Sequence, residues 1–209
     1  MSPLDTTRAR FVHSPELERF HYPQACPFNS QRAARARQII RSMGLLQPPE
    51  VWEVAPRPLA RDLLERFHSL DYLDILQRAA RGEFDPAWLS TNLGGDDTPY
   101  FPDMYDYSIA ACAASVTGAE LILEGEAEIA FNPSGGLHHA GPDYAEGFCY
   151  LNDVVLACLR LVDAGKRVAV VDIDVHHGDG VQDAFYDSDD VLLVDLHESG
   201  ETLFPGTGA

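Results

Sequence analysis

Short apolar runs alternate with segments of helical periodicity along most of the chain. The apolar runs predict strands at 51–54, 129–131, 168–173 and 191–196. Apolar residues three to four apart, together with capping residues, predict helices at 30–46, 59–66, 69–81, 103–124, 150–164 and 179–187. Strands that alternate with helices in this way are typical of a parallel sheet with helices on both faces. The expected fold class is therefore α/β, a three-layer α/β/α arrangement around a mainly parallel sheet.

Caps and buried faces follow from the same pattern. Residues 1–29 mix proline, histidine and aromatic residues without a period, and we expect an irregular arm on the surface. Ser30 and Asp103 are the expected N-caps of the helices that begin there. The inward residues expected for helices 30–46 and 69–81 are Ala34, Ile39, Ile40 and Met43 in the first, and Leu70, Leu73, Ile75 and Leu76 in the second. The strand at 129–131 is expected to be buried.

Length and charge narrow the class of protein. A chain of 209 residues, 45% of them hydrophobic, suits one globular domain with a sizeable core. The net charge is −18, but residues 1–48 carry seven Arg against three acidic residues, so the remainder carries −22. An acidic body of this kind disfavours direct binding of nucleic acid and suits cationic partners.

The four cysteines and the N-terminus indicate the compartment. The cysteines lie far apart without a C-x-x-C pair, which favours neither a disulfide framework nor a thiolate zinc site. The N-terminus lacks the apolar core of a signal peptide, and no apolar run approaches the roughly 18 residues of a membrane span. We therefore expect a cytoplasmic protein without a membrane partner, and the sequence does not indicate an oligomeric state.

The segment 168–180, VAVVDIDVHHGDG, carries the clearest chemical signal. It runs an apolar strand into Asp172, Asp174 and His176 at steps of two, and side chains two apart share one face of an extended strand. Open α/β sheets bind ligands just beyond the carboxyl ends of their strands. Two carboxylates and an imidazole at that position indicate a metal site. The alternative is that these are solvated loop residues, which three liganding side chains in register disfavour.

A second segment, 135–153, reads GGLHHAGPDYAEGFCYLND. Its adjacent histidines, His138 and His139, follow a flexible double glycine and point their rings in different directions. A histidine pair is as often structural as catalytic. Because Asp172 and Asp179 are available to fix the imidazole tautomers, we predict two Asp–His dyads for general acid–base catalysis.

These two segments, together with DLHESGETLFPGTG at 195–208, resemble the zinc-dependent histone deacetylase family, especially the bacterial acetoin-utilisation type of lysine deacetylase. The similarity extends from FHSLDYL at 67–73 and LGGDDTP at 93–99 to the last residue. It implies an arginase/deacetylase-like fold in which residues 1–209 are the N-terminal portion of one catalytic domain. The chain stops in a loop with nothing to cover the next sheet edge, so the fold is expected to be incomplete at its C-terminus.

The resemblance implies a role for each member of the two dyads. His139, paired with Asp179, would act as the general base and then as the general acid. His138, paired with Asp172, would stabilise charge electrostatically. An imidazole would thus remove a proton from water and later deliver it to the leaving amine, without a covalent intermediate.

The resemblance also implies two metal sites. Asp174 and His176 would be two of three ligands of Zn²⁺, with ferrous iron as the alternative ion in the cell. A structural K⁺ ion would be held by the side chains of Asp172 and Asp195 and by backbone carbonyl groups, including that of Leu196. Position 195 is Asp where the familiar family members have Ser, and an extra carboxylate would strengthen the cation site.

The substrate-contacting residues implied by the resemblance surround a narrow tunnel for the acetyl-lysine stem. Gly147, Phe148 and Phe204 would line that tunnel. Asp97 would bind the substrate backbone at its rim. Arg32, in QRAAR, resembles the arginine of an acetate-exit pocket.

Two family elements have no counterpart in these 209 residues: the third zinc ligand, an Asp, and the Tyr that stabilises the oxyanion. Asp195 and His197 are not expected to replace the ligand, because they belong to the neighbouring strand and match other family positions. Zinc should therefore bind more weakly, and the loss of one oxyanion donor typically costs about 10² to 10³ in rate.

Three functions remain open. The favoured one is a portion of a metal-dependent amide hydrolase that removes acetyl groups from lysine side chains of proteins, and the chain alone is then expected to be inactive. The second is a deacetylase of acetylated polyamines or other small amides. The third is a catalytically incomplete fragment that serves as a binding module. Arginase-like hydrolysis is disfavoured because the ligands suffice for one catalytic metal ion.

Overall fold

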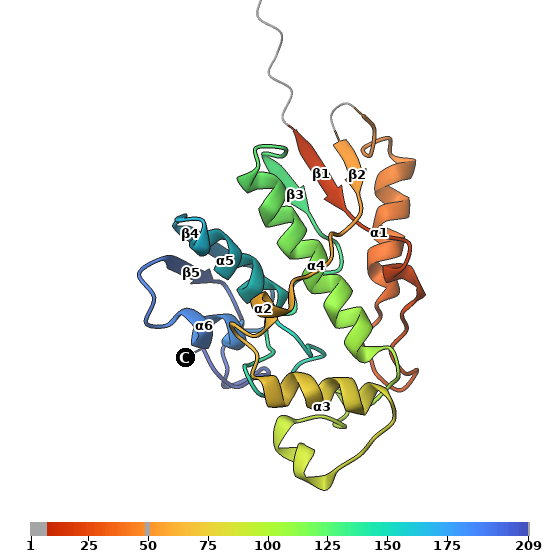
Figure 1. Ribbon diagram of the computed structural model, residues 1–209, viewed down its shortest axis with the longest axis vertical. Helices are drawn as coiled ribbons and strands as arrows, with labels where there is room; N and C mark the ends of the chain where they lie inside the picture. Colours follow the sequence, from red (N-terminus) through yellow and green to blue (C-terminus); the bar gives the residue numbers. More distant parts are fainter. Residues whose placement is uncertain (1–7, 49–50, 209) are drawn as a thin grey trace, which may run out of the picture.

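The computed structural model describes residues 8–48 and 51–208. Its main elements, in chain order, are β1 (Ala9–Val12), α1 (Gln31–Ser42), β2 (Val51–Val54), α2 (Arg61–Leu64), α3 (Leu70–Ala80), α4 (Met104–Leu123), β3 (Ile129–Phe131), α5 (Asp153–Asp163), β4 (Val168–Asp172), α6 (Asp179–Phe185) and β5 (Val191–Asp195) (Figure 1). Short 3-10 helices lie at Leu17–Arg19 and Pro86–Thr91. Each predicted helix and strand is present, with ends that differ by a few residues.

The strands form two sheets, in the orders β2-β1-β3 and β4-β5, and every strand pair is parallel. In the second sheet the register pairs Val168 with Val191 and Asp172 with Asp195. Because the strands run in the same direction, both aspartates lie at the carboxyl edge of this sheet. Two acidic side chains from separate segments of the sequence thus meet at one edge.

Helix α4 is the central helix of the molecule. It contacts β1 and β3 on one side and packs against α3 and α5 on others. The largest core cluster contains Leu73, Leu76, Tyr150 and Leu156, among other buried residues. Tyr150 lies three residues before the first residue of α5, and Leu156 lies within this helix, so the core fixes the position at which α5 begins. Across the described parts of the chain, none of the helices has the length and apolar character that crossing a bilayer requires.

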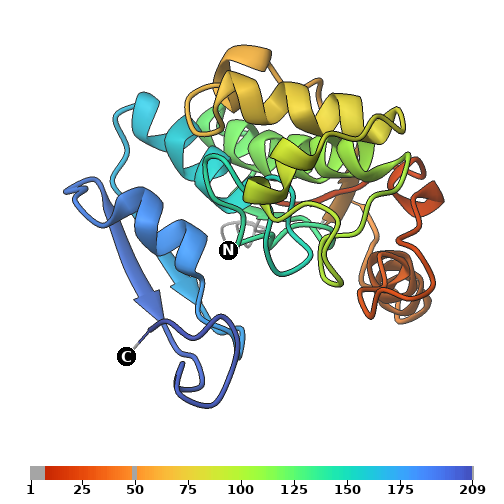
Figure 2. The ribbon, with the colours of Figure 1, turned by 90° about the horizontal axis from the view of Figure 1, so that it is seen from below.

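The two faces of the β4–β5 pair differ. Helices α5 and α6 cover one face (Figure 2). On that face Val170 and Leu193 pack against the cluster that contains Val155 and Val181. The opposite face exposes apolar side chains in the described residues: Val171, Ile173, Leu192, Val194 and Leu196. The helices predicted for both faces are therefore found on one face of this pair within the part of the chain that the structure describes.

The expectation of an irregular arm over 1–29 was wrong for β1, while residues 1–7 lie outside the described residues. β1 pairs with β2 and β3, so its extended conformation depends on partners far away in the sequence. The expectation that 129–131 is buried was also wrong. Ile129 and Phe131 are about half exposed because they lie on the face of β3 opposite Ala130, which packs against Gly118 of α4.

The buried faces of two helices were predicted only in part. In α1 the buried residues are Ala33 and Ala34, whereas Ile39 and Met43 are exposed, because the end of this helix projects along the edge of the molecule (Figure 1). In α3, Leu73 and Leu76 are buried as predicted, but Leu70, in the first turn, is exposed.

Neither predicted N-cap makes a capping hydrogen bond. Ser30 has helical backbone angles, and its hydroxyl donates to the carbonyl of Phe20 at 2.7 Å instead. The side chain of Asp103 accepts no hydrogen bond from the first turn of α4. Ser69 and Asn152, in contrast, cap α3 and α5 through their side chains.

Candidate active site

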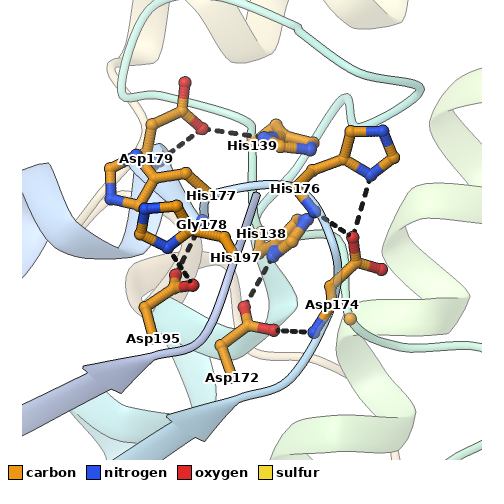
Figure 3. A network of polar contacts seen from close by, with 12 residues as sticks. His138, His139, Asp172, Asp174, His176, His177, Gly178, Asp179, Asp195 and His197 are labelled. Carbon is orange, nitrogen blue, oxygen red and sulfur yellow. Dashed lines mark hydrogen bonds and ion pairs between the residues drawn. The ribbon is translucent and has the colours of Figure 1, made fainter. Parts of the chain in front are cut away.

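Two adjacent histidines meet two aspartates beyond the carboxyl end of β4 (Figure 3). His138 Nδ1 lies 2.7 Å from Asp172 Oδ2, and His139 Nδ1 lies 2.8 Å from Asp179 Oδ1. Both imidazoles are buried. Because a carboxylate can only accept, Nδ1 is the donor in each pair, which leaves Nε2 as the nitrogen that can exchange a proton. The structure thus brings together both Asp–His pairs expected from the sequence.

The His138–Asp172 pair is electrostatically polarised. Burial lowers the pKa of His138, but the hydrogen bond to Asp172 and nearby negative charges outweigh it, so the pKa is raised. Burial raises the pKa of Asp172, but the hydrogen bonds from His138 and from the backbone N–H of Asp174 outweigh it, so the pKa is lowered. The pair therefore favours an ionised carboxylate beside an imidazole that holds its proton strongly.

Asp174 and His176 follow β4 directly and point toward each other (Figure 3). Asp174 Oδ1 lies 2.9 Å from His176 Nδ1 and accepts the backbone N–H of His176 at 2.8 Å. Burial raises the pKa of Asp174, but these bonds from His176 outweigh it and lower the pKa overall. The two side chains are 50% and 38% exposed, so solvent reaches this pair far more easily than the histidine turn.

This pair fits a zinc ion by the chemistry of its donors. A carboxylate oxygen and an imidazole nitrogen are both typical zinc ligands, and their separation of 2.9 Å is close to the roughly 3.3 Å expected between two ligands at tetrahedral zinc distances. Within residues 8–48 and 51–208, no third His, Cys, Asp or Glu forms a metal-binding group with them. The pair would therefore supply part of a coordination sphere.

The described residues contain one group of three potential ligands, His177, Asp195 and His197. The nitrogens of His177 are bonded to Thr207 and Gln182, and those of His197 to Asp195 and to the carbonyl of Gly208. Gly208 also packs so closely against both rings that an added Cβ would collide with them. The chain's own groups already occupy this cluster.

A cavity of about 260 Å³ opens beside the histidines and the Asp174–His176 pair. The predicted site residues that line it are His138, His139, Gly147, Phe148, Asp174, His176, Phe204 and Arg32. The sequence did not reveal two further lining residues, Phe28 and Tyr107. Phe28 stacks on Phe148 at 5.6 Å between ring centroids and lies 5.2 Å from the Arg32 guanidinium carbon, so it joins two predicted substrate-contacting residues.

The expected tunnel residues lie against His139. Gly147 has φ of 54°, and a Cβ at this position would collide with the His139 ring, so only glycine fits. The Phe204 ring also contacts His139, with 5.1 Å between the centroids. Asp97 does not line the cavity, but its Oδ2 accepts the backbone N–H of Gly147 at 2.9 Å. Phe148 also has a positive φ, 69°, which turns the chain sharply beside the cavity.

The residues expected to hold a monovalent cation lie behind the histidine turn. Asp195 is engaged on both oxygens, accepting the backbone N–H of Gly178 at 2.8 Å and facing His197 Nδ1 at 2.7 Å. Hydrogen bonds to the Gly208 carbonyl and to Asp195 raise the pKa of His197. An imidazole with a raised pKa thus lies beside the extra carboxylate. Leu196 is expected to contribute its backbone carbonyl, and its side chain is exposed.

The comparisons with known proteins agree with this fold. The model of the histone deacetylase domain matches residues 26–209. The chain is 39% identical to histone deacetylase B of Dictyostelium discoideum over 204 residues, 97% of this chain and 48% of that protein. It is 36% identical to histone deacetylase RPD3 of Saccharomyces cerevisiae over 211 residues, 100% of this chain and 48% of that protein.

The crystal structure of an HDAC homolog from Aquifex aeolicus superimposes with a TM-score of 0.82 at 34% identity, covering 95% of this chain and 53% of that one. The chain therefore belongs to the histone deacetylase family, and its predicted α/β fold class, with a mainly parallel sheet, is confirmed. It spans about half the length of the relatives that it matches.

Proposed function

We propose that this chain carries the proton-transfer groups and part of the metal site of a metal-dependent deacetylase that acts on acetylated lysine side chains of proteins. The observation that carries the proposal is the convergence of two Asp–His pairs, with buried imidazoles, and the Asp174–His176 pair on one cavity. Membership of the histone deacetylase family supports the same reaction class.

Amide hydrolysis joins the oxygen of water to the acyl carbon, breaks the C–N bond and transfers a proton from water to the leaving amine. Nε2 of His139 would transfer this proton, because Nδ1 is hydrogen-bonded to Asp179. The carboxylate of Asp179 holds the neutral tautomer with the proton on Nδ1 and stabilises the imidazolium that forms when Nε2 accepts a proton. His138, hydrogen-bonded to Asp172, would stabilise charge on the reacting amide electrostatically.

Asp174 and His176 would hold Zn²⁺, with ferrous iron as the alternative. A bound zinc ion would supply Lewis acidity, polarising the amide carbonyl and lowering the pKa of a coordinated water. Because two protein ligands bind zinc more weakly than three, the chain alone should have low zinc affinity. A structural K⁺ ion at Asp172, Asp195 and the Leu196 carbonyl is part of the same proposal.

The apolar walls of the cavity suit the stem of an acetylated lysine. The rings of Phe148 and Phe204 would contact its methylene groups, while Gly147 leaves room next to His139. Asp97 would orient the substrate backbone at the rim, and Arg32 would interact with the acetate product. The chain's net charge of −18 suits substrates with cationic surroundings.

The test measures zinc content and hydrolysis of an acetyl-lysine peptide for this chain and for the chain joined to any coding sequence that follows it. We expect zinc retention and turnover in the longer form, and the loss of both in its Asp174→Ala variant. Acetylated polyamine, assayed in parallel, should be a poorer substrate. Absence of turnover from both forms, with zinc present, would contradict the proposal and favour a binding module.

A further inference from the structure

The turn that carries His138 and His139 is attached to two neighbouring side chains at the start of α5. We propose, on the basis of the function above, that Asn152 and Asp153 are positioning residues that set the place of both imidazoles. Asn152 is 0% and Asp153 is 1% exposed, and neither is among the residues that line the catalytic cavity. They act through the backbone of the turn and do not touch the substrate.

Asp153 holds the part of the turn that precedes the histidines. Its Oδ1 accepts the backbone N–H of Leu137 at 2.7 Å, and its Oδ2 accepts that of Gly136 at 3.2 Å. The hydroxyl of Ser115, on α4, donates to the same Oδ2. A buried carboxylate is stable only when such donors compensate its desolvation. Asp153 therefore ties the turn to both α5 and α4.

Asn152 holds the part of the turn around His139. Its Nδ2 donates to the backbone carbonyls of His138 at 3.2 Å and of Ala140 at 3.0 Å. These carbonyls flank the peptide unit of His139, so one amide group sets the direction of the chain on both sides of the proposed base. Its Oδ1 meanwhile caps α5 by accepting the N–H of Val155 at 3.1 Å.

The dyads depend on this attachment because their two partners come from different elements. The imidazoles belong to the turn, whereas Asp172 ends β4 and Asp179 begins α6. The distances of 2.7 and 2.8 Å within the dyads require the turn to stay in register with both elements. Displacing a reacting group by about 1 Å can cost on the order of 10²-fold in rate.

The test is Asn152→Ser, measured in whichever form of the protein hydrolyses acetyl-lysine. Serine is about as good an N-cap as asparagine, so α5 stays capped, but its hydroxyl is too short to reach both carbonyls. We expect kcat to fall on the order of 10²-fold while KM and zinc content stay unchanged. Ser69→Ala is the matched control, because it removes the comparable N-cap of α3 and should leave kcat nearly unchanged.

Unchanged kcat in Asn152→Ser, an equal loss in Ser69→Ala, or a loss of zinc that parallels the loss of rate would each overturn the positioning role. A second measurement does not depend on the proposed function. The N–H groups of Gly136 and Leu137 donate to the two oxygens of Asp153, and Asp153→Asn keeps only one acceptor oxygen. Hydrogen exchange of at least one of these amides, followed in this chain without metal or substrate, should therefore become at least about 10-fold faster in Asp153→Asn. Unaltered exchange contradicts the attachment, whereas an inactive wild-type protein contradicts only the deacetylase proposal.

Discussion

The double-histidine turn and the Asp174–His176 pair border the same cavity, but the chain holds them in opposite ways. The turn is buried, and side chains from α5, β4 and α6 bond to it. Asp174 and His176 are bonded mainly to each other and to the end of β4, and they adjoin the exposed apolar residues Ile173 and Val175. One half of the site is fixed by tertiary structure, and the other by contacts within a few residues.

The two halves of the site are therefore ordered by different interactions. The proposed proton-transfer groups are held in place by the fold of this chain, as efficient general acid–base catalysis requires. The proposed metal ligands lie on an exposed edge, where a bound ion would itself supply much of the order because it draws both donors to one point. Changes in the two halves should therefore have different consequences for metal binding, rate and stability.

The largest expected effect comes from His139→Ala. Removal of a general base typically costs about 10² to 10⁴ in kcat, and zinc should be retained because His139 is not a proposed ligand. Rate assays and metal analysis of the same preparation check this, with the exposed His21→Ala as the control. Zinc loss together with the rate would show that the two halves are not separable.

The second prediction concerns pH and the buried half. Burial lowers the pKa of His68 from 6.5 to about 4, and its Nε2 accepts the backbone N–H of Asn152 at 3.1 Å. Between these two values the unfolded state binds more protons, so the free energy of unfolding should fall as the pH falls from 6.5 to 4. The full loss is at most about 3 kcal/mol. Denaturant titrations at several pH values measure it, and His68→Gln should flatten the profile.

Two other groups with shifted pKa values, His138 and Asp174, affect the free energy of unfolding in different pH ranges. The pKa of His138 is raised, so its contribution is complete below the unfolded-state value and is lost as the pH rises through its folded-state pKa. The pKa of Asp174 is lowered, so its contribution is present above the ordinary carboxyl range and is lost as the pH falls below about 4. A slope between pH 4 and 6.5 that survives His68→Gln would assign the effect to other groups.

The sequence indicated the candidate site residues, but it did not indicate the residues that hold them in place. Asp172, Asp174 and His176 follow an apolar strand at steps of two, and that local pattern places them at the end of β4. The role of Asn152 and Asp153 depends on bonds to the backbone of residues 12 to 17 positions earlier, which no local pattern encodes. Both residues fall within the helix predicted at 150–164, and nothing in its pattern indicates the attachment of a turn.

The difference between local pattern and tertiary contacts also explains which features of the fold were predicted wrongly. β1 has only four residues, and it is a strand because β2 and β3 flank it. The apolar run of β4, VAVVD, places apolar side chains on both faces of the strand, but it cannot tell which of those faces is covered. Helix periodicity likewise marked Ile39 and Met43 as inward, although α1 extends past its packing partners there. Local pattern defines the element, and tertiary neighbours decide which of its faces is buried.

The smallest expected effect tests the exposed face directly. Val171 is 64% exposed on β4, so Val171→Ala should change the free energy of unfolding of this chain by less than about 0.5 kcal/mol. Leu73→Ala, in the buried core, should cost about 2 to 5 kcal/mol and is the comparison variant. Denaturant unfolding of both variants in this chain measures the contrast. A cost for Val171→Ala near that of Leu73→Ala would mean that the face is covered in solution, and the Asp174–His176 pair beside it would then be ordered by packing as the histidine turn is.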